Sequence, residues 1–390
     1  MGIKLGMVGL GSFAQCFIPL FKAHPLVDEV TLCDLDPEKL EANSKMYGIN
    51  NKSPSLDHLL TTDVDAVAII TQNWMHAPQA SKALAAGKHV YSAVPMGIDI
   101  NEIKSVIKAA ESSGKIYMMG ETSYYYPETV YCREKYKKGE FGYIVYGEAE
   151  YYHDWDHGLY DVAKWRGGDK WLETAGGPPM HYPTHSVGMI SSVTGAHMLS
   201  VSCRGFKDRK DLHIYGAGTN IWGNEFSNQT ALFEMSDGSS CRINEFRRVG
   251  HTGTVRMSMF GTEGCFEHNT AGAAWVTKRD STRVDDLLSV TEERQKIEAA
   301  LSGGRGCYAN IHASEKKRLP KEFFGLPNGH EGSHQFLVDD FVKACVYNKL
   351  PPVNAWAAAR YTVPGIIAHE SSLKGGEVLE IPDFGNPPLD

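Results

Sequence analysis

Two consecutive segments near the start of the chain, Ile3-Lys-Leu-Gly-Met-Val8 and Gly9-Leu-Gly-Ser-Phe-Ala14, decide the fold. The first is rich in apolar residues and predicts a buried strand, and the second predicts a tight turn that leads into a helix over Phe13–Ala23. In this G-x-G-x-x-A pattern, Gly9 permits the turn, Gly11 lets a pyrophosphate approach the backbone, and the small Ala14 lets the helix pack on the strand. The pattern therefore predicts a dinucleotide site at this turn.

Asp34 lies at the end of the next predicted strand, Glu29–Asp34, at about the distance expected after such a turn. A carboxylate at this position accepts hydrogen bonds from ribose hydroxyls and repels a 2′-phosphate, and no arginine follows it. The sequence therefore favours NAD over NADP as the cofactor. The alternative is a glycine turn in an α/β domain that binds no nucleotide.

Short apolar runs continue to alternate with amphipathic stretches up to about residue 120, which is typical of βαβ units. Asp36 and Pro37 are placed to cap and begin a helix over Pro37–Tyr47. This alternation predicts a doubly wound parallel sheet, and so a Rossmann domain over residues 1–123. Its further predicted strands and helices are Ala66–Ile70, His76–Ala86, His89–Tyr91, Asn101–Ser112 and Ile116–Met119.

The pattern changes after residue 123, where a predicted helix over Glu128–Lys138 is followed by long runs of alternating polar and apolar residues. Asp237-Gly238 and Gly261-Thr-Glu-Gly264 have the composition of hairpin turns. We therefore expect an α/β domain over residues 124–390 with a large, mostly antiparallel, open-faced sheet. The charged, glycine-rich region 279–330 is expected to form a long excursion. The predicted strands and helices are Tyr143–Tyr152, Leu199–Phe206, Thr230–Met235, Ser240–Phe246, Thr254–Phe260, Gln335–Tyr347 and Ala355–Leu373.

The composition argues against several classes of protein. The 390 residues carry 39 Lys and Arg against 47 Asp and Glu, a formal net charge of −8 without a basic stripe, which argues against a nucleic-acid partner. No apolar run approaches the roughly 20 residues needed to span a bilayer, and the glycine-broken N-terminal stretch is not expected to be a signal peptide. The eight cysteines are scattered without a Cys-x-x-Cys pair, so we expect reduced thiols in a cytoplasmic protein.

Several segments resemble the Gfo/Idh/MocA family, which is named after glucose–fructose oxidoreductase and inositol dehydrogenase. They are the N-terminal turn, Thr71-Gln-Asn-Trp-Met-His76, Ala86-Gly-Lys-His-Val90 with the Pro95 loop, Ala175-Gly-Gly177, Phe260-Gly-Thr-Glu-Gly264 and Asp339-Asp-Phe341. The resemblance runs over nearly the full length and implies an NAD domain followed by a substrate domain. It places the following residues at the cofactor: Gly9, Gly11, Ser12, Phe13, Asp34, Thr71, Asn73, His76, Val94, Pro95 and Glu121.

Two positions depart from the dehydrogenases of this family. Those enzymes usually carry Glu-Lys-Pro where this chain has Ala93-Val94-Pro95, so the amine that helps to deprotonate the reacting hydroxyl is absent. They also usually carry Asp-x-x-x-His, and the Asp position is His181 here. Other segments are similar to the NAD-dependent glycoside hydrolases of this fold, of which the α-N-acetylgalactosaminidases are the best known. These segments are Met118–Glu121, Glu148–Asp154, Trp165-Arg166, Tyr182-Pro-Thr-His185 and Gly329-His-Glu-Gly332.

The resemblance implies a redox-neutral cycle in which NAD oxidises a sugar hydroxyl, usually at C3, and the ketone acidifies the hydrogen on C2. His185 suits the base for the hydroxyl, because an imidazole accepts and donates protons near neutral pH. Tyr182 suits the base near C2 if neighbouring positive charges lower the pKa of its phenol. Three residues apart, the two would share one face of a helical turn. The alternative is a tyrosine that packs on the sheet and a structural histidine.

Four further residues are expected to contact the sugar, namely His153, Asp154, Arg166 and His181. His153 and Asp154 could instead be polar residues at a strand end, and Arg166 could form an exposed salt bridge. Histidines and carboxylates of residues 153–157, or His181 with His185, could also bind a metal. The resemblance implies no metal, and we expect none.

The sequence leaves three functions open: a redox-neutral NAD-dependent glycosidase, a sugar or polyol dehydrogenase in which His185 alone handles the proton, and an NAD-binding regulator. Loss of the lysine fits the regulator, but Tyr182, His185 and Arg166 argue against it. We expect a small carbohydrate substrate. An open sheet with few covering helices also predicts a homo-oligomer, either a dimer or a tetramer.

Overall fold

The computed structural model describes residues 2–209, 213–216, 218–284, 318–326 and 328–388. They form two compact units. The first comprises Met1–Pro127, Ser289–Ala359 and Phe384–Asp390, and the second comprises Glu128–Leu288 and Arg360–Asp383. Most of the excursion that we expected over residues 279–330 lies outside the described residues. The domain boundary between residues 123 and 124 stays a prediction.

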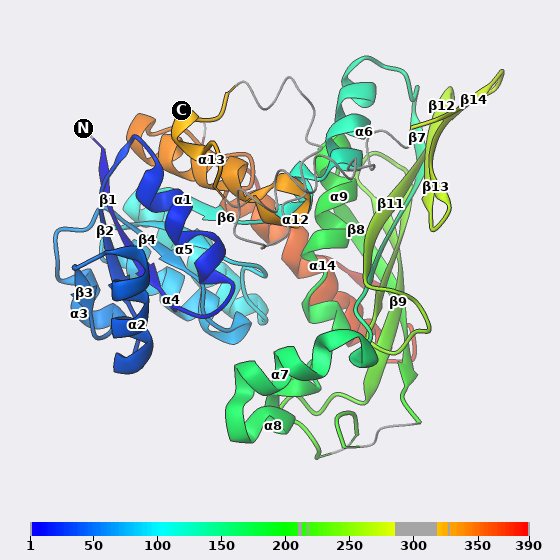
Figure 1. Cartoon of the computed structure of the whole chain (residues 1–390). Helices are drawn as coiled ribbons and strands as arrows, with labels where there is room; N and C mark the ends of the chain where they lie inside the picture. The colour runs from blue at the N-terminus through cyan, green and yellow to red at the C-terminus, as the bar shows by residue number, and fades with distance from the viewer. Residues whose placement is uncertain (1, 210–212, 217, 285–317, 327, 389–390) are drawn as a thin grey trace. The chain divides into compact units, whose positions relative to one another are not determined.

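The first unit contains a six-stranded sheet in the order β3-β2-β1-β4-β5-β6, and every neighbouring pair is parallel (Figure 1). This is the strand order of a doubly wound dinucleotide-binding sheet, so the predicted Rossmann fold is confirmed. The runs Ala66–Ile69 and Tyr117–Met119 are buried throughout, as expected for parallel strands. The strands are β1 Ile3–Val8, β2 Val27–Cys33, β3 Lys52–Ser53, β4 Ala66–Ile69, β5 His89–Ser92 and β6 Tyr117–Met119.

Helices of the first unit begin largely where the sequence predicts. Asp36 caps α2 by accepting the backbone N–H groups of Glu38 and Lys39. The helices are α1 Ile18–Ala23, α2 Pro37–Tyr47, α3 Leu56–Leu60, α4 Asn73–Ala85, α5 Ile100–Ser113, α12 Gly329–Gly332 and α13 His334–Tyr347. The short 3₁₀ helices are η1 Ala14–Cys16, η2 Thr122–Tyr125 and η7 Lys321–Phe323.

The helix after the glycine turn differs from the prediction. Instead of one helix over Phe13–Ala23, the chain forms η1 and then α1, which begins at Ile18. Pro19 explains the break, because it has no N–H to donate to the carbonyl of residue 15 and its ring would clash with that carbonyl in a continuous helix. The turn therefore leads into a 3₁₀ helix rather than an α-helix.

The second unit contains a nine-stranded sheet in the order β14-β13-β12-β11-β7-β10-β9-β8-β15. Among the described strands of this sheet, only β7 and β10 pair in parallel, so the predicted mostly antiparallel sheet is confirmed. Both predicted hairpins are present, joining β9 to β10 and β11 to β12. The strands are β7 Ile144–Tyr152, β8 Met198–Lys207, β9 Phe226–Met235, β10 Ser240–Phe246, β11 Thr254–Gly261, β12 Gly264–Asn269, β13 Gly272–Thr277, β14 Ser281–Arg283 and β15 Leu379–Glu380.

One face of this sheet packs against helices. Gly147 of β7 lies against Ile190 of α9, and Ser371 of α14 accepts the backbone N–H of Cys203 in β8. Successive strand residues point to opposite faces, so the helix-covered face also carries Ala149, Tyr151 and the residues level with them. The helices are α6 Pro127–Lys137, α7 Tyr160–Gly167, α8 Trp171–Ala175, α9 Thr184–Thr194 and α14 Ala355–Leu373, and residues of α14 from Arg360 onward belong to this unit.

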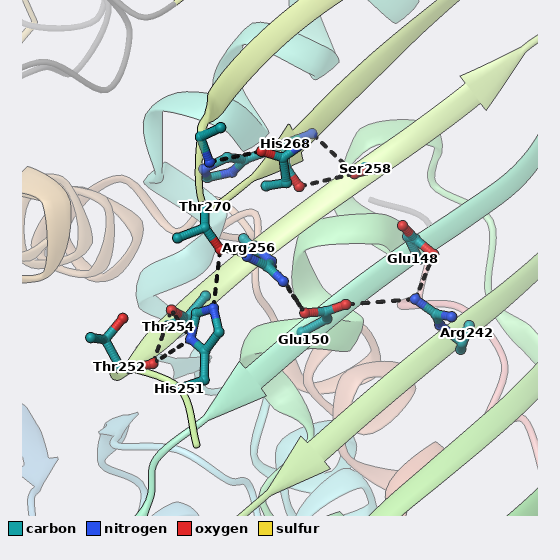
Figure 2. Close-up of polar contacts among 12 residues, drawn as sticks. Glu148, Glu150, Arg242, His251, Thr252, Thr254, Arg256, Ser258, His268 and Thr270 are labelled. Carbon is teal, nitrogen blue, oxygen red and sulfur yellow. Dashed lines mark hydrogen bonds and ion pairs between the residues drawn. The ribbon is translucent and has the colours of Figure 1, made fainter. Parts of the chain in front are cut away.

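The opposite face of the sheet, here called the outer face, carries a row of charges across three strands (Figure 2). Arg256 of β11 donates two hydrogen bonds, of 2.8 and 3.1 Å, to Glu150 of β7. Arg242 of β10 lies 2.8 Å from Glu148 and 3.6 Å from Glu150. The outer face is therefore ion-paired within the chain.

No helix among the described residues is long and apolar enough to cross a membrane. The seven cysteines that the structure describes are all free thiols.

Candidate active site

Gly9 and Asp34 fix the shape of the glycine turn. Gly9 has φ +86°, and a Cβ there would lie 2.6 Å from the carbonyl oxygen of Ile70, so only glycine fits. The backbone N–H of Leu10 donates to Asp34 Oδ2 over 2.8 Å, and that of Asp36 donates to Oδ1 over 2.9 Å. These bonds hold the Asp34 carboxylate beside the turn, as a ribose-binding group requires.

Five of the predicted cofactor residues share one pattern, because each lies one or two residues after the end of a strand. Gly9 follows β1, Asp34 follows β2, Thr71 follows β4, Val94 follows β5 and Glu121 follows β6. The carboxyl edge of a doubly wound sheet is where nucleotides bind. The residues present therefore fit a dinucleotide.

His76 joins two of these loops. Its ring nitrogens lie 2.8 Å from the carbonyl oxygen of Pro95 and 3.1 Å from that of Thr71. Asn73 is the first residue of α4, and its side chain accepts the backbone N–H of Trp74. His76 is almost fully buried, so the structure places it as a support between the loops.

The turn has a neighbour that the sequence did not assign to the cofactor. The ring of Phe13 lies 5.5 Å from the ring of His330 and 5.7 Å from that of His334, which are themselves joined by a 2.8 Å hydrogen bond. Gly11 is half-buried and Ser12 is exposed. The glycine-flanked motif Gly329–Gly332 was the signal for His330, but nothing local connects it with a turn more than three hundred residues earlier.

In the second unit the structure brings Tyr182 and His185 together, although not as predicted. Tyr182 has φ −129° and ψ 54° and precedes α9, so the two residues do not share a helical turn. Their ring centroids are nevertheless 5.3 Å apart at an interplanar angle of 73°. Pro183 accounts for the difference, because the residue before a proline is disfavoured in the helical region.

Tyr151 of β7 is a third ring at this site. Its centroid lies 5.5 Å from that of His185 and 6.0 Å from that of Tyr182. Its hydroxyl hydrogen-bonds Nδ1 of His153 over 3.0 Å, and the Arg247 guanidinium lies 4.8 Å from its ring centroid. The sequence analysis did not single out Tyr151, although strand alternation would have placed it on the same face as His153.

A buried ion pair lies beside these rings. Glu245 of β10 accepts a 2.7 Å hydrogen bond from the Ser186 hydroxyl and a 3.2 Å bond from Arg247 Nη2. Burial raises the pKa of Glu245 to about 7, although the charge of Arg247 opposes the shift. Neither Glu245 nor Arg247 was predicted.

The other predicted sugar contacts are distributed around this cluster. Burial and the charges of Arg247 and Arg166 lower the pKa of His153 to about 4, so Arg166 acts on the cluster electrostatically. Asp154 instead accepts backbone N–H groups from Asp156 and Val249, which makes it a turn-forming residue in this structure.

His181 occupies a separate buried contact. Its ring lies 5.1 Å from that of His369, and burial lowers the pKa of His181 to about 3. His369 Nδ1 accepts from the Gln229 amide over 3.1 Å. Within the described residues, no group of three or more His, Cys, Asp or Glu side chains is arranged to hold a metal ion.

Comparison with known proteins agrees with this architecture. Residues 3–121 match the GFO_IDH_MocA model, described as an oxidoreductase family with an NAD-binding Rossmann fold. A glycosyl hydrolase family 109 protein of Streptomyces filamentosus is 23% identical, covering 98% of this chain and 77% of that protein. Another, from Shewanella amazonensis, is 29% identical over 48% of this chain and 44% of its own length.

Solved structures confirm the fold. A levoglucosan dehydrogenase in complex with NADH and levoglucosan superimposes with a TM-score of 0.75 at 16% identity, covering 98% of this chain and all of that one. An oxidoreductase domain protein from Kribbella flavida gives a TM-score of 0.74 at 18% identity, with the same coverage. Residues 3–121 therefore match the NAD-binding domain of the Gfo/Idh/MocA oxidoreductases, as the motifs predict, and the chain as a whole has the fold of these solved proteins.

Proposed function

We infer that this NAD-dependent enzyme is a glycoside hydrolase that acts by transient oxidation of a ring hydroxyl, at C3 of the sugar. One observation carries the proposal: the half-buried Tyr182 phenol and the buried His185 imidazole lie with ring centroids 5.3 Å apart. Simple dehydrogenation needs one proton acceptor, whereas elimination across C1 and C2 needs a second. Three family 109 relatives, which match over 98% of this chain, support the same function.

Each residue has a defined part in this proposal. Bound NAD, held by the loops at Gly9, Asp34 and Thr71, supplies a reversible hydride acceptor for the sugar carbon. His185 takes the proton of the hydroxyl, and Tyr182 takes the C2 proton that the neighbouring ketone has made acidic. Loss of this proton expels the group at C1, and water adds in its place. The same residues return the protons, and the reduced cofactor would return its hydride to the ketone carbon, so that the net reaction is hydrolysis.

The second candidate is a sugar or polyol dehydrogenase of the same family. It is favoured by the fold likeness to dehydrogenases and needs only His185 as the base. It differs in outcome, because it leaves one reduced cofactor per turnover.

The experiment that separates the two is hydrolysis of aryl glycosides of both anomers in D2O with NAD. We expect free sugar carrying deuterium at C2 and no growth of the reduced-nicotinamide band at roughly 340 nm. His185→Ala and Tyr182→Phe should each lower the rate at least about 100-fold with nearly unchanged NAD affinity. Stoichiometric reduced cofactor with C2 hydrogen retained would establish the dehydrogenase instead.

We also propose that the chain forms a homo-oligomer through the outer face of the second-unit sheet. Leu232 and Phe206 are on this face and are 55% and 53% exposed. Large apolar side chains on an open sheet are typical of an interface. Light scattering at micromolar concentration should give a dimer or tetramer, and a monomer would contradict the proposal. The cytoplasmic location likewise stays a prediction.

A further inference from the structure

Glu245 is a carboxylate with no solvent-exposed surface in the helix-covered face of the second-unit sheet. It accepts the Ser186 hydroxyl over 2.7 Å on one oxygen and Arg247 Nη2 over 3.2 Å on the other. Ser186 directly follows His185 in α9. Because burying a carboxylate is costly, its position beside the candidate base calls for a functional explanation.

The groups that face Glu245 come from four elements. Arg247, which directly follows β10, is the cation, but it also donates to the backbone carbonyls of Phe246 and Tyr151. Gln229, opposite Glu245 in β9, is neutral and already bonded to Met180, His369 and Ser372. From β7, Tyr151 lies level with Glu245 and interacts with it electrostatically.

His185 of α9 is the remaining group, and its charge acts on Glu245. The carboxylate therefore faces a guanidinium shared among three acceptors and an imidazole that changes charge when it takes a proton. A carboxylate in this position favours the imidazolium form and fixes the orientation of the ring.

We propose that Glu245 is a positioning residue for His185: through Ser186 it fixes the first turn of α9, and through its charge it stabilises the imidazolium formed when His185 takes the proton of the substrate hydroxyl. The part that concerns the substrate rests on the proposed function. A single proton moves from the hydroxyl to the imidazole, and Glu245 stays ionised throughout.

Glu245 can stabilise the His185 imidazolium only at a pH at which the carboxylate is ionised. Because burial raises the pKa of Glu245 to about 7, protonation below that pH removes the negative charge beside His185. The two groups titrate as a coupled pair, so the acid limb of the pH–rate profile reports on both.

Glu245→Gln tests the charge while keeping the size and one acceptor of the side chain. The matched control is Glu150→Gln, because Glu150 is also a buried, arginine-paired carboxylate of this sheet but points to the outer face (Figure 2). Two measurements are made on the full-length protein. The first is the titration midpoint of the His185 ring by NMR, assigned with His185→Gln, and the second is the pH profile of kcat and KM.

Glu245→Gln should lower the titration midpoint of His185 by about one pH unit. The acid limb of the pH–rate profile should move to lower pH as well. The substitution should reduce kcat on the order of 100-fold while KM changes little, because the charge matters most after proton transfer. Glu245→Asp should recover part of both effects, and Glu150→Gln should change neither.

An unchanged His185 midpoint in Glu245→Gln, or an equal shift in Glu150→Gln, would overturn the proposal. If Glu245→Gln does not fold, Ser186→Ala is the test instead. We expect this variant to have a lower kcat and an unchanged NAD affinity. Full activity would contradict the proposal that Glu245 positions His185 through Ser186. The NMR midpoint needs no substrate. A shifted midpoint in a protein that hydrolyses no glycoside would therefore contradict the proposed function but leave the pairing of Glu245 with His185 intact.

Discussion

Gly9 and Gly87 both hold a positive φ, +86° and +75°, but only Gly9 lies against another backbone. A Cβ at Gly9 would approach the carbonyl of Ile70, whereas a Cβ at Gly87 has nothing within 4 Å. Both alanine variants therefore meet the same unfavourable dihedral region, at a cost of about 1 kcal/mol. The difference in NAD affinity between the two variants therefore measures the effect of the contact between a Cβ at position 9 and the carbonyl of Ile70.

We expect Gly9→Ala to weaken NAD binding at least about tenfold, because the turn must move to relieve the clash. Gly87→Ala should lower the thermal midpoint slightly and leave NAD affinity within error of the wild type. Titration calorimetry and thermal melts of both variants provide the measurement. Equal NAD affinities in the two variants would show that the turn tolerates the side chain.

The candidate cluster around His185 shows which residues a motif can predict. Tyr182 and His185 stand in a short segment with a family likeness, so the sequence finds them. Glu245 lies in β10 and Arg247 directly follows it, and a Glu-x-Arg pair at a strand end is commonly exposed. The alternation Cys241, Ile243, Glu245 places the carboxylate on the buried face, but only the fold shows that α9 brings His185 there.

At the scale of elements, proline decides where the predicted helices begin. The periodicity after the glycine turn predicts a helix correctly, but Pro19 divides it. Pro183 keeps Tyr182 out of α9 in the same way. Whether a helix forms can be predicted from the spacing of apolar residues over several turns. The residue at which the helix begins depends on single backbone groups, such as the missing N–H of a proline.

Arg318 anchors α13 within the first unit. It donates 2.8 Å hydrogen bonds to both Asp339 and Asp340 and a 2.7 Å bond to the hydroxyl of Tyr125. The side chain of Asp339 has no exposed surface and that of Asp340 is 13% exposed. Two adjacent carboxylates with so little solvent depend on this guanidinium and on Lys343.

We predict that Arg318→Ala lowers the free energy of unfolding by about 3 kcal/mol, since it leaves buried carboxylates short of a cation. Arg318→Lys should lose less, because it keeps the charge but not the forked geometry. Lys278→Ala, which breaks an exposed pair with Glu263, is the control and should cost under about 1 kcal/mol. Urea unfolding compares the three, and equal midpoints for Arg318→Ala and Lys278→Ala would refute the anchor.

At the scale of the whole molecule, the sequence predicts both sheets because their strands carry local patterns. It does not predict contacts between distant segments. His24, beside α1, lies 3.4 Å from Asp339 of α13, which is 315 positions away. The parallel pairing of β7 with β10 is a second example, since neither strand specifies its partner. Such contacts depend on the assembled core rather than on local composition.

The whole molecule also carries a set of half-buried or buried, neutral imidazoles that should make its stability sensitive to acid. Burial is the main cause in each case, and it lowers the pKa to about 3 at His181 and to about 4 at the others. These others are His89, His153, His268 and His369. In the unfolded chain the same groups take up protons with a pKa of about 6.5.

Between pH 6.5 and 4 the unfolded chain therefore binds more protons than the folded chain, and stability falls as the pH falls. Each displaced proton changes the free energy of unfolding by about 1.4 kcal/mol per pH unit. Glu245 acts in the opposite direction, because its raised pKa makes the folded state the better proton acceptor up to about pH 7. Burial also raises the pKa of Glu102, Glu331 and Asp340 and lowers that of His334. Six imidazoles against four carboxylates lead us to expect a net loss of stability on acidification.

We predict that the thermal midpoint, followed by circular dichroism, is nearly constant from pH 8 to 7 and drops steeply from pH 6 to 4.5. His268→Gln should make the drop shallower, because it removes one of the groups that take up a proton on unfolding, and His268 lies in β12, two strands away from β7 in the sheet. High salt should change the profile little, since burial rather than screened surface charge is the first cause of these shifts. A midpoint that stays constant down to pH 4.5 would mean that these imidazoles are solvated and protonated in the folded protein.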